Sequence, residues 1–339
     1  MIREAIAHLI EGRSISQAEA EQVMTEIMDG EATPAQLGAF LMALRTKGEG
    51  VDEIAGLARV MRARALRVEV DDPDSLLDTC GTGGDASHTF NISTTAALVA
   101  AGAGLRVAKH GNRAASSACG SADVLEAAGV TIELEPEQVA HCIDSAGIGF
   151  MFAPKYHPAM RHAAGPRREI GVRTVFNILG PLTNPAHAGH QLVGVPRPEL
   201  VETIARVLGE LGAKRAIVVH GADGLDEIAL SGPSIMAEYR DGSVTVQEIA
   251  PEQFGLAHAG VDQIRSEDVE SSHRIFTNVL NGEPGPYRDI VLINAAAALV
   301  AGEAADDLSE GLESARESID SGAARNRLEK LVAASNKDS

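Results

Sequence analysis

Cysteine is scarce in this chain and tryptophan is absent. It contains no tryptophan and only three cysteines, Cys80, Cys119 and Cys142, none of them in a Cys-x-x-Cys arrangement. An odd number of widely spaced cysteines argues against a disulfide-stabilised secreted fold, and the missing Cys-x-x-Cys spacing argues against a structural zinc site. We therefore expect a protein of a reducing compartment, with a cytoplasmic location.

Basic residues are also few relative to acidic ones. Lys and Arg number 29 against 48 Asp and Glu, which gives a formal net charge of −19. Proteins that bind nucleic acid or a membrane surface usually carry a basic excess, so neither partner is expected. No apolar run reaches spanning length, and Met1-Ile2-Arg3-Glu4 mixes charges without a signal-peptide core. An anionic small ligand stays compatible with this balance, because a few local cations or a divalent metal would bind it.

The length and apolar content predict a substantial core. A chain of 339 residues with 45% hydrophobic residues favours two domains or one large α/β unit. Residues 1 to about 70 predict helices only, since Ser16-Gln17-Ala18-Glu19 and Thr33-Pro34-Ala35-Gln36 both match a capping box. Asp71-Asp72-Pro73 then predicts a break in the helical pattern, and we place a domain boundary there.

From residue 74 onward, strands and helices alternate. The expected strands are residues 76–79, 105–109, 148–152, 191–195 and 215–220. The expected helices are residues 93–102, 121–128, 136–146, 158–170, 198–211, 270–281, 287–301 and 307–334. Residues 235–240 and 243–249 predict a hairpin that turns at Asp241-Gly242. The expected fold class is therefore α/β, with a small all-α N-terminal domain and a larger α/β domain around a mainly parallel central sheet.

The most informative segment is a glycine-rich loop after the first expected strand, Asp78-Thr79-Cys80-Gly81-Thr82-Gly83-Gly84-Asp85. Glycines let backbone N–H groups converge on a bulky anion, and Asn91-Ile92-Ser93-Thr94 opens a helix whose N-terminus adds donors. A dinucleotide fold is disfavoured, because Lys109-His110 stands where a ribose-binding acid would be expected. A glycine turn without a ligand would be the better interpretation of the loop alone. The polar run that follows it favours a phosphate or diphosphate site.

A second polar loop follows the next expected strand. It begins Lys109-His110-Gly111-Asn112-Arg113 and continues to Ser121, so it combines two cations with an imidazole, an amide and hydroxyls. Such groups suit phosphate oxygens, although a loop of this kind standing alone would be an ordinary solvated surface. The carboxyl ends of neighbouring parallel strands meet at one edge of a sheet. We therefore expect the two loops to form one joint site.

Two further segments leave alternatives open. Asp223-Gly224-Leu225-Asp226-Glu227 follows the strand at 215–220, and its carboxylates suit Mg²⁺, but an acidic turn without a metal explains them equally well. Arg167-Arg168 and the segment 171–177 come after His157. An Arg inside a pocket could pair with a substrate carboxylate, but an ordinary basic helix surface is the simpler interpretation of these residues alone.

Taken in order, these motifs resemble those of the anthranilate phosphoribosyltransferase family, over nearly the whole chain. The matching segments are Gly81-Thr82-Gly83-Gly84-Asp85, Asn91-Ile92-Ser93-Thr94, Lys109-His110-Gly111-Asn112-Arg113, Ser116-Ser117, Asn177-Ile178-Leu179-Gly180-Pro181-Leu182-Thr183-Asn184-Pro185 and Asp223-Gly224-Leu225-Asp226-Glu227. The resemblance implies a helical domain of residues 1–72 with returning helices at about 168–188. It implies an α/β domain of residues 73–167 and 189–339, and a homodimer formed through the small domain.

The resemblance also implies a reaction. The phosphoribosyl group of 5-phosphoribosyl 1-pyrophosphate would pass to the amine of anthranilate, giving N-(5-phosphoribosyl)anthranilate and pyrophosphate in the second step of tryptophan biosynthesis from chorismate. Mg²⁺ would take part, at about two ions per monomer, since this cation commonly shares its ligands with substrate phosphates.

Carried over by position, the resemblance implies the site residues. The phosphoribosyl pyrophosphate would contact Gly81, Gly84, Asp85, Thr89, Asn91, Ile92, Ser93, Thr94, Lys109, His110, Gly111, Asn112, Arg113, Ala114, Ala115, Ser116, Ser117 and Ser121. Anthranilate would lie against Gly81, His110, Asn112 and Arg167, and the magnesium ligands would be Ser93, Asp226 and Glu227. Lys109 and Arg167 would support the transition state. Ala118-Cys119-Gly120 departs from the family's more usual Lys-Ser-Gly, so backbone contacts are expected there.

Two alternatives from other classes remain. A pyrimidine-nucleoside phosphorylase resembles this fold, but a Lys-x-Ser-x-Arg-like loop and a longer C-terminal domain would be expected in it. A non-catalytic homologue that binds nucleic acid is opposed by the acidic balance and by the retained Arg167, Asp226 and Glu227.

Overall fold

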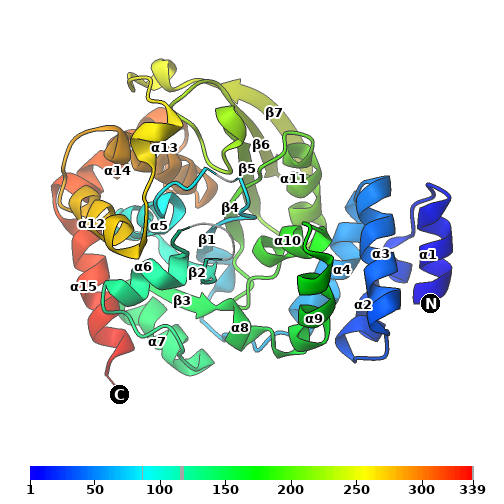
Figure 1. Ribbon diagram of the computed structural model, residues 1–339. Coiled ribbons are helices and arrows are strands. Elements are labelled where there is room, and N and C mark those ends of the chain that lie inside the picture. The colour runs from blue at the N-terminus through cyan, green and yellow to red at the C-terminus, as the bar shows by residue number, and fades with distance from the viewer. Residues whose placement is uncertain (86, 115–117, 338–339) are drawn as a thin grey trace.

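The computed structural model describes residues 1–85, 87–114 and 118–337 and shows a helical bundle beside a larger α/β body (Figure 1). The bundle consists of α1 (Ile2–Ile10), α2 (Gln17–Met28), α3 (Pro34–Lys47) and α4 (Val51–Ala63). Both predicted capping boxes are confirmed. Ser16 Oγ accepts the Glu19 N–H at 3.3 Å, and Thr33 Oγ1 accepts the Gln36 N–H at 3.3 Å. These side chains satisfy donors that the first helical turn leaves open.

The body is built on a seven-stranded sheet in the order β3-β2-β1-β4-β5-β6-β7. Its strands are β1 (Leu76–Gly81), β2 (Arg106–Gly111), β3 (Ile148–Phe152), β4 (His190–Gly194), β5 (Arg215–His220), β6 (Ser234–Arg240) and β7 (Ser243–Ile249). The first five run parallel, and β6 and β7 are antiparallel. The predicted fold class is confirmed, and so is the hairpin, where Asp241 and Gly242 both have positive φ as a two-residue turn requires.

The order of the strands indicates at which edge of the sheet a ligand is expected to bind. The chain runs outward from β1 to β2 and β3 and then returns to add β4 on the other side of β1. In parallel sheets, ligands bind beyond the carboxyl ends of the strands, where the strand order reverses. Here that point lies between β1 and β4, whose last residues Gly81 and Gly194 are register partners.

Helices cover both faces of the sheet (Figure 1). Those of the body are α5 (Ile92–Gly102), α6 (Ser121–Ala127), α7 (Pro136–Ala146), α8 (Ala153–Tyr156), α9 (Arg161–Ile170), α10 (Val175–Leu179), α11 (Leu200–Glu210), α12 (Val269–Leu280), α13 (Pro286–Ala301), α14 (Leu308–Asp320) and α15 (Ala323–Ser335). Successive strand residues face opposite sides, so Leu192 and Ile217 join a core with α5 and α13. Val193 and Val218 join a second core with α11 and the helical bundle.

Two of the predicted helices are each divided in the structure. Residues 307–334 form two helices instead of one, because the chain turns at Gly322, whose φ of +77° lies in the left-handed region. The bend lets α14 pack on α13 and α15 pack on α5 and α7. Residues 158–170 also divide, into a short 3-10 turn at Pro158–Met160 and α9. Among the residues that the structure describes, no helix combines the length and apolar character of a membrane span.

The segment of α9 and α10 returns to the helical bundle, where α9 packs on α2 and α3, and α10 packs on α3 and α4.

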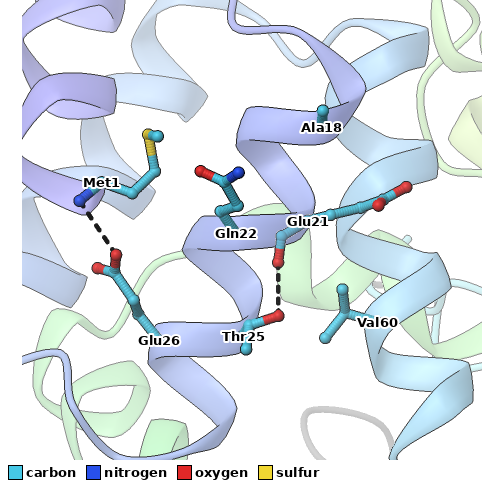
Figure 2. A pocket seen from close by; sticks show the side chains of 7 residues that line it. All are labelled: Met1, Ala18, Glu21, Gln22, Thr25, Glu26 and Val60. Atoms are coloured by element: carbon cyan, nitrogen blue, oxygen red, sulfur yellow. Dashed lines mark hydrogen bonds and ion pairs between the residues drawn. The ribbon is translucent and has the colours of Figure 1, made fainter.

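A separate shallow recess lies on the bundle itself, lined by Met1, Ala18, Glu21, Gln22, Thr25, Glu26 and Val60 (Figure 2). Glu26 lies 3.0 Å from the Met1 amine and accepts the Ile2 N–H at 3.1 Å. A carboxylate at the start of a helix complements the helix dipole. The contacts of Glu26 with Met1 and Ile2 therefore hold α1 against α2.

Candidate active site

A cleft of about 380 Å³ opens at the carboxyl ends of β1 and β2. It collects every predicted site residue that the structure describes, namely Gly81, Gly84, Asp85, Thr89, Asn91, Ile92, Ser93, Thr94, Lys109, His110, Gly111, Asn112, Arg113, Ala114, Ser121, Arg167, Asp226 and Glu227. The predicted Ala115, Ser116 and Ser117 lie outside the described residues. Segments far apart in sequence therefore meet in one cavity, as the rule for parallel strands led us to expect.

The glycine loop lies directly against the acidic turn. The Gly83 N–H donates to Asp226 Oδ2 at 2.8 Å. A Cβ atom at Gly81 would come within 2.4 Å of that oxygen, and one at Gly194 would come within 1.5 Å of the Asp226 carbonyl oxygen. Glycine is required at both positions, because only a residue without a side chain allows the acidic turn to approach β1 and β4 this closely.

Helix α5 begins at the same place. The carbonyl of Ser93, in its first turn, accepts from Thr79 Oγ1 at 3.1 Å, and its backbone N–H acts to lower the pKa of Glu227. The side chain of Asn91, just before the helix, donates to the Cys119 carbonyl at 3.2 Å and accepts from Ser272 Oγ at 2.8 Å. The helix start is thus fixed between the acidic turn, the second polar loop and α12, with its N-terminal donors at the cleft.

Asp226 and Glu227 are an acid pair whose charge the surrounding protein offsets only in part. Burial, followed by the nearby Asp85 carboxylate, raises the pKa of Asp226. Burial, followed by Asp226, raises the pKa of Glu227 well above its usual range. Within residues 1–85, 87–114 and 118–337, no three His, Cys, Asp or Glu side chains converge as a metal cluster. The donor set consists of hard oxygen ligands with unbalanced charge, and this fits Mg²⁺ that takes its remaining ligands from water or phosphate.

The acid pair should make metal-free stability depend on pH. A carboxyl whose folded pKa lies above its unfolded value favours folding least where it is charged. The pKa of Asp226 is raised to about 7, so its unfavourable contribution should grow as pH rises from about 4 toward 7. We expect the melting temperature of Asp226→Asn in EDTA to exceed that of the wild type by more at pH 8 than at pH 5. Differential scanning calorimetry measures this, and an equal difference at both pH values would contradict it.

Lys109 and His110 end β2 with both side chains buried. Lys109 Nζ donates to the Thr79 carbonyl and lies 3.5 Å from Thr79 Oγ1, so its charge is held at the cleft by the neighbouring strand. The His110 N–H donates to Asp78 Oδ1 at 3.1 Å, and its ring Nδ1 lies 3.2 Å from the Gly180 carbonyl. Burial, reinforced by His157 at a ring distance of 5.1 Å, lowers the pKa of His110 to about 3. The imidazole is therefore neutral at physiological pH.

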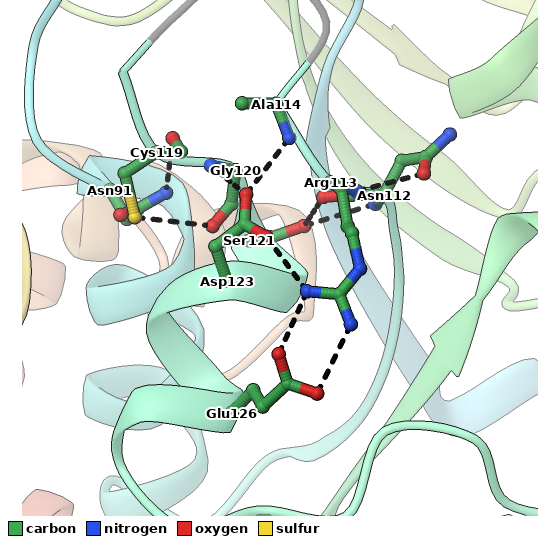
Figure 3. A network of polar contacts seen from close by, with 9 residues as sticks. All are labelled: Asn91, Asn112, Arg113, Ala114, Cys119, Gly120, Ser121, Asp123 and Glu126. Atoms are coloured by element: carbon green, nitrogen blue, oxygen red, sulfur yellow. Dashed lines mark hydrogen bonds and ion pairs between the residues drawn. The ribbon is translucent and has the colours of Figure 1, made fainter. Parts of the chain in front are cut away.

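Arg113 points along the second polar loop toward α6 (Figure 3). Its guanidinium donates to Asp123 at 2.9 Å and to both Glu126 oxygens at 2.8 and 3.1 Å. Asp123 also accepts the backbone N–H groups of Ala114 and Gly120, and Ser121 Oγ exchanges hydrogen bonds with the Asn112 backbone. The sequence interpretation missed Asp123, which organises this loop. With its guanidinium held by two acids, Arg113 contributes to the loop's shape more than to its free positive charge.

Arg167 approaches the cleft from the returning segment, near the end of α9. Its guanidinium carbon lies 5.0 Å from the centre of the Phe176 ring, a cation–π distance. Phe176, Asn177, Gly180 and Pro181 line the same part of the cleft. An aromatic ring beside a half-buried guanidinium is chemically suited to a planar aromatic carboxylate. This geometry favours the pocket interpretation of Arg167 over a plain basic surface.

Comparison with protein families first gives the class. Residues 73–325 match the glycosyl transferase family, a/b domain, and residues 3–65 match the helical bundle domain of the same family. The anthranilate phosphoribosyltransferase of Chloroflexus aurantiacus is 59% identical over 336 residues, 98% of each chain. That of Symbiobacterium thermophilum is 57% identical over 330 residues, 97% of this chain and 96% of the relative. The chain belongs to the anthranilate phosphoribosyltransferase family.

Solved structures agree with this assignment. Anthranilate phosphoribosyltransferase from Thermus thermophilus superposes with a TM-score of 0.91 at 45% identity, covering 97% of this chain and 98% of that one. The Saccharomyces cerevisiae enzyme in complex with PRPP and Mg superposes with a TM-score of 0.89 at 27% identity, covering 98% and 97%. The same enzyme in complex with 4-fluoroanthranilate gives 0.88 at 26% identity, with the same coverage.

Proposed function

We propose that this chain transfers the phosphoribosyl group of 5-phosphoribosyl 1-pyrophosphate to the amine of anthranilate, releasing pyrophosphate, in the second step of tryptophan biosynthesis. The observation that carries the proposal is the cleft itself. One cavity unites a glycine loop, a helix N-terminus and an acid pair with an aromatic ring and an arginine that lies over it. Each half matches one of the two substrates that this reaction joins.

The donor half consists of the glycine loop, the start of α5 and the second polar loop. Backbone N–H groups and the buried cation of Lys109 suit the pyrophosphate and ribose phosphate oxygens. Ser93, Asp226 and Glu227 would hold Mg²⁺, which when bound neutralises the departing pyrophosphate. The other proposed donor contacts within the described residues are Gly81, Gly84, Asp85, Thr89, Asn91, Ile92, Thr94, His110, Gly111, Asn112, Arg113, Ala114 and Ser121.

The acceptor half would hold anthranilate between Asn112 and Arg167. Its carboxylate would pair with the Arg167 guanidinium, and its ring would lie along the wall that includes Phe176. In the reaction the bond from ribose C1 to pyrophosphate breaks, the bond from C1 to the amine nitrogen forms, and the amine loses a proton. The chain's main task is to hold both substrates in line and to favour charge on the leaving group, which needs no protein nucleophile.

The test uses the purified chain with anthranilate, phosphoribosyl pyrophosphate and Mg²⁺, and follows the loss of anthranilate fluorescence. We expect turnover that needs all three components. A parallel reaction with thymidine and inorganic phosphate tests the nucleoside phosphorylase alternative. Phosphorolysis without anthranilate consumption would contradict the proposal.

The proposal extends to the oligomeric state, the cellular location and the number of bound magnesium ions. A homodimer through the helical bundle is supported by exposed apolar side chains there, with Ile10 72% and Met42 38% exposed on α1 and α3. Light scattering after size-exclusion chromatography should then give twice the 35.4 kDa monomer mass. A cytoplasmic location and about two Mg²⁺ per monomer, shared with substrate phosphates, complete the proposal.

A further inference from the structure

Arg173 connects the returning segment to the glycine loop, and the proposed function gives it no role. It lies between Gly171, whose φ of +67° ends α9, and Thr174, whose N–H donates to Asn177 Oδ1 at 3.0 Å where α10 begins. Its backbone is therefore fixed on both sides. The side chain is half-buried and lines the cleft.

The guanidinium of Arg173 holds the glycine loop directly. One terminal nitrogen donates to the Thr82 carbonyl at 3.0 Å. A Cβ atom at Gly84 would lie 1.2 Å from the other terminal nitrogen. The guanidinium therefore occupies space that exists only because residue 84 has no side chain. The conformations of the glycine loop and of the Arg173 side chain are therefore coupled through these contacts.

Arg173 also lines a second cavity of about 220 Å³, whose lining includes Arg45, Glu49 and Arg197. There the buried Glu49 carboxylate pairs with Arg197 at 3.4 Å and lies 3.9 Å from Arg45. Burial lowers the pKa of Arg173, while the Asp226 and Asp85 carboxylates act in the opposite direction. The Asp226 and Asp85 carboxylates of the donor half therefore favour the charged form of Arg173.

We infer that Arg173 is a positioning residue for the donor substrate. Through Thr82 and Gly84 its guanidinium keeps the glycine loop in the shape that accepts a diphosphate, and it places positive charge beside Asp85 and Asp226. This rests on the proposed function. It deepens that function by linking the donor loop to the segment that carries Arg167, the proposed acceptor contact.

The test compares Arg173→Ala and Arg173→Lys with the wild-type full-length chain. Losing a charge-assisted hydrogen bond should raise the KM for phosphoribosyl pyrophosphate about tenfold in Arg173→Ala. The KM for anthranilate should change by less than about threefold, well under the effect of one such bond. Arg173→Lys, which restores the charge without the second donor, should recover part of the loss. Arg168→Ala, which removes an exposed cation from the same segment, is the matched control and should behave as wild type.

A readout without turnover completes the test. Hydrogen–deuterium exchange in a peptide that covers Gly81 to Asp85 should be faster in Arg173→Ala than in the wild type and unchanged in Arg168→Ala. Equal changes in both Michaelis constants, or unaltered kinetics and exchange in an active protein, would overturn the inference. An inactive wild-type chain would instead overturn the proposed function, so the two failures are distinguishable.

Discussion

Replacing Asp226 by Asn together with Glu227 by Gln should lower kcat/KM by at least about 100-fold and remove its dependence on Mg²⁺ concentration. Asp226 accepts the Gly83 N–H of the glycine loop. Burial raises the pKa of both carboxyls, followed by the Asp85 charge for Asp226 and the Asp226 charge for Glu227, and their neighbours compensate this only in part. A metal ion that compensates them contributes several kcal/mol of charge stabilisation, and each 1.4 kcal/mol is tenfold in rate, so about 100-fold is a conservative expectation. Initial rates across a Mg²⁺ titration measure the effect.

Structural damage can be separated from loss of the metal. Asn and Gln keep the shape of the replaced side chains, and Asn at 226 can still accept the Gly83 N–H. The double variant should therefore remain folded in EDTA and melt no lower than the wild type. Asp223→Asn is the matched control, because Asp223 is an exposed acid of the same turn with a φ of +61°, which Asn tolerates. If the double variant keeps wild-type activity at low Mg²⁺, the metal assignment fails.

Much of the fold could be predicted because its signals are local. The Asp241-Gly242 turn and both capping boxes depend on residues within a few positions of one another, and all three are confirmed. The break at Gly322 was missed because the residues on both sides favour a helix, and packing of α14 and α15 on different partners decides the matter.

The meeting of the loops could also be predicted, because the order of parallel strands brings their carboxyl ends together. The directions in which individual side chains point could not be predicted from the sequence. The sequence predicts a phosphate contact for Arg113. It does not indicate that both terminal nitrogens of its guanidinium donate to Glu126 on the following helix. Asn91 is held by Ser272, a partner 181 positions away that no sequence pattern indicates. Arg173 stood in a segment that looked like a basic surface, and only the fold brings it to Thr82.

Replacing Arg167 by Ala should raise the KM for anthranilate by about 10- to 100-fold, the effect of losing a paired, charge-assisted contact. The KM for phosphoribosyl pyrophosphate should change much less, because the guanidinium of Arg167 lies over the Phe176 ring, which belongs to the proposed acceptor half of the cleft. The planar guanidinium of Arg167, held near that ring, suits two parallel hydrogen bonds to a carboxylate. Steady-state kinetics with each substrate varied in turn measure both constants.

A substrate without the carboxylate isolates the contact. Arg167→Lys should lose most of the affinity as well, because an ammonium cannot reproduce the two-pronged geometry. With aniline as the acceptor, the wild type and Arg167→Ala should be equally poor, since the group that Arg167 would bind is missing. Arg168→Ala, which alters the adjacent exposed cation, should leave both Michaelis constants unchanged. If Arg167→Ala shifts the two constants equally, or slows aniline as much as anthranilate, then Arg167 shapes the cleft and does not select the carboxylate.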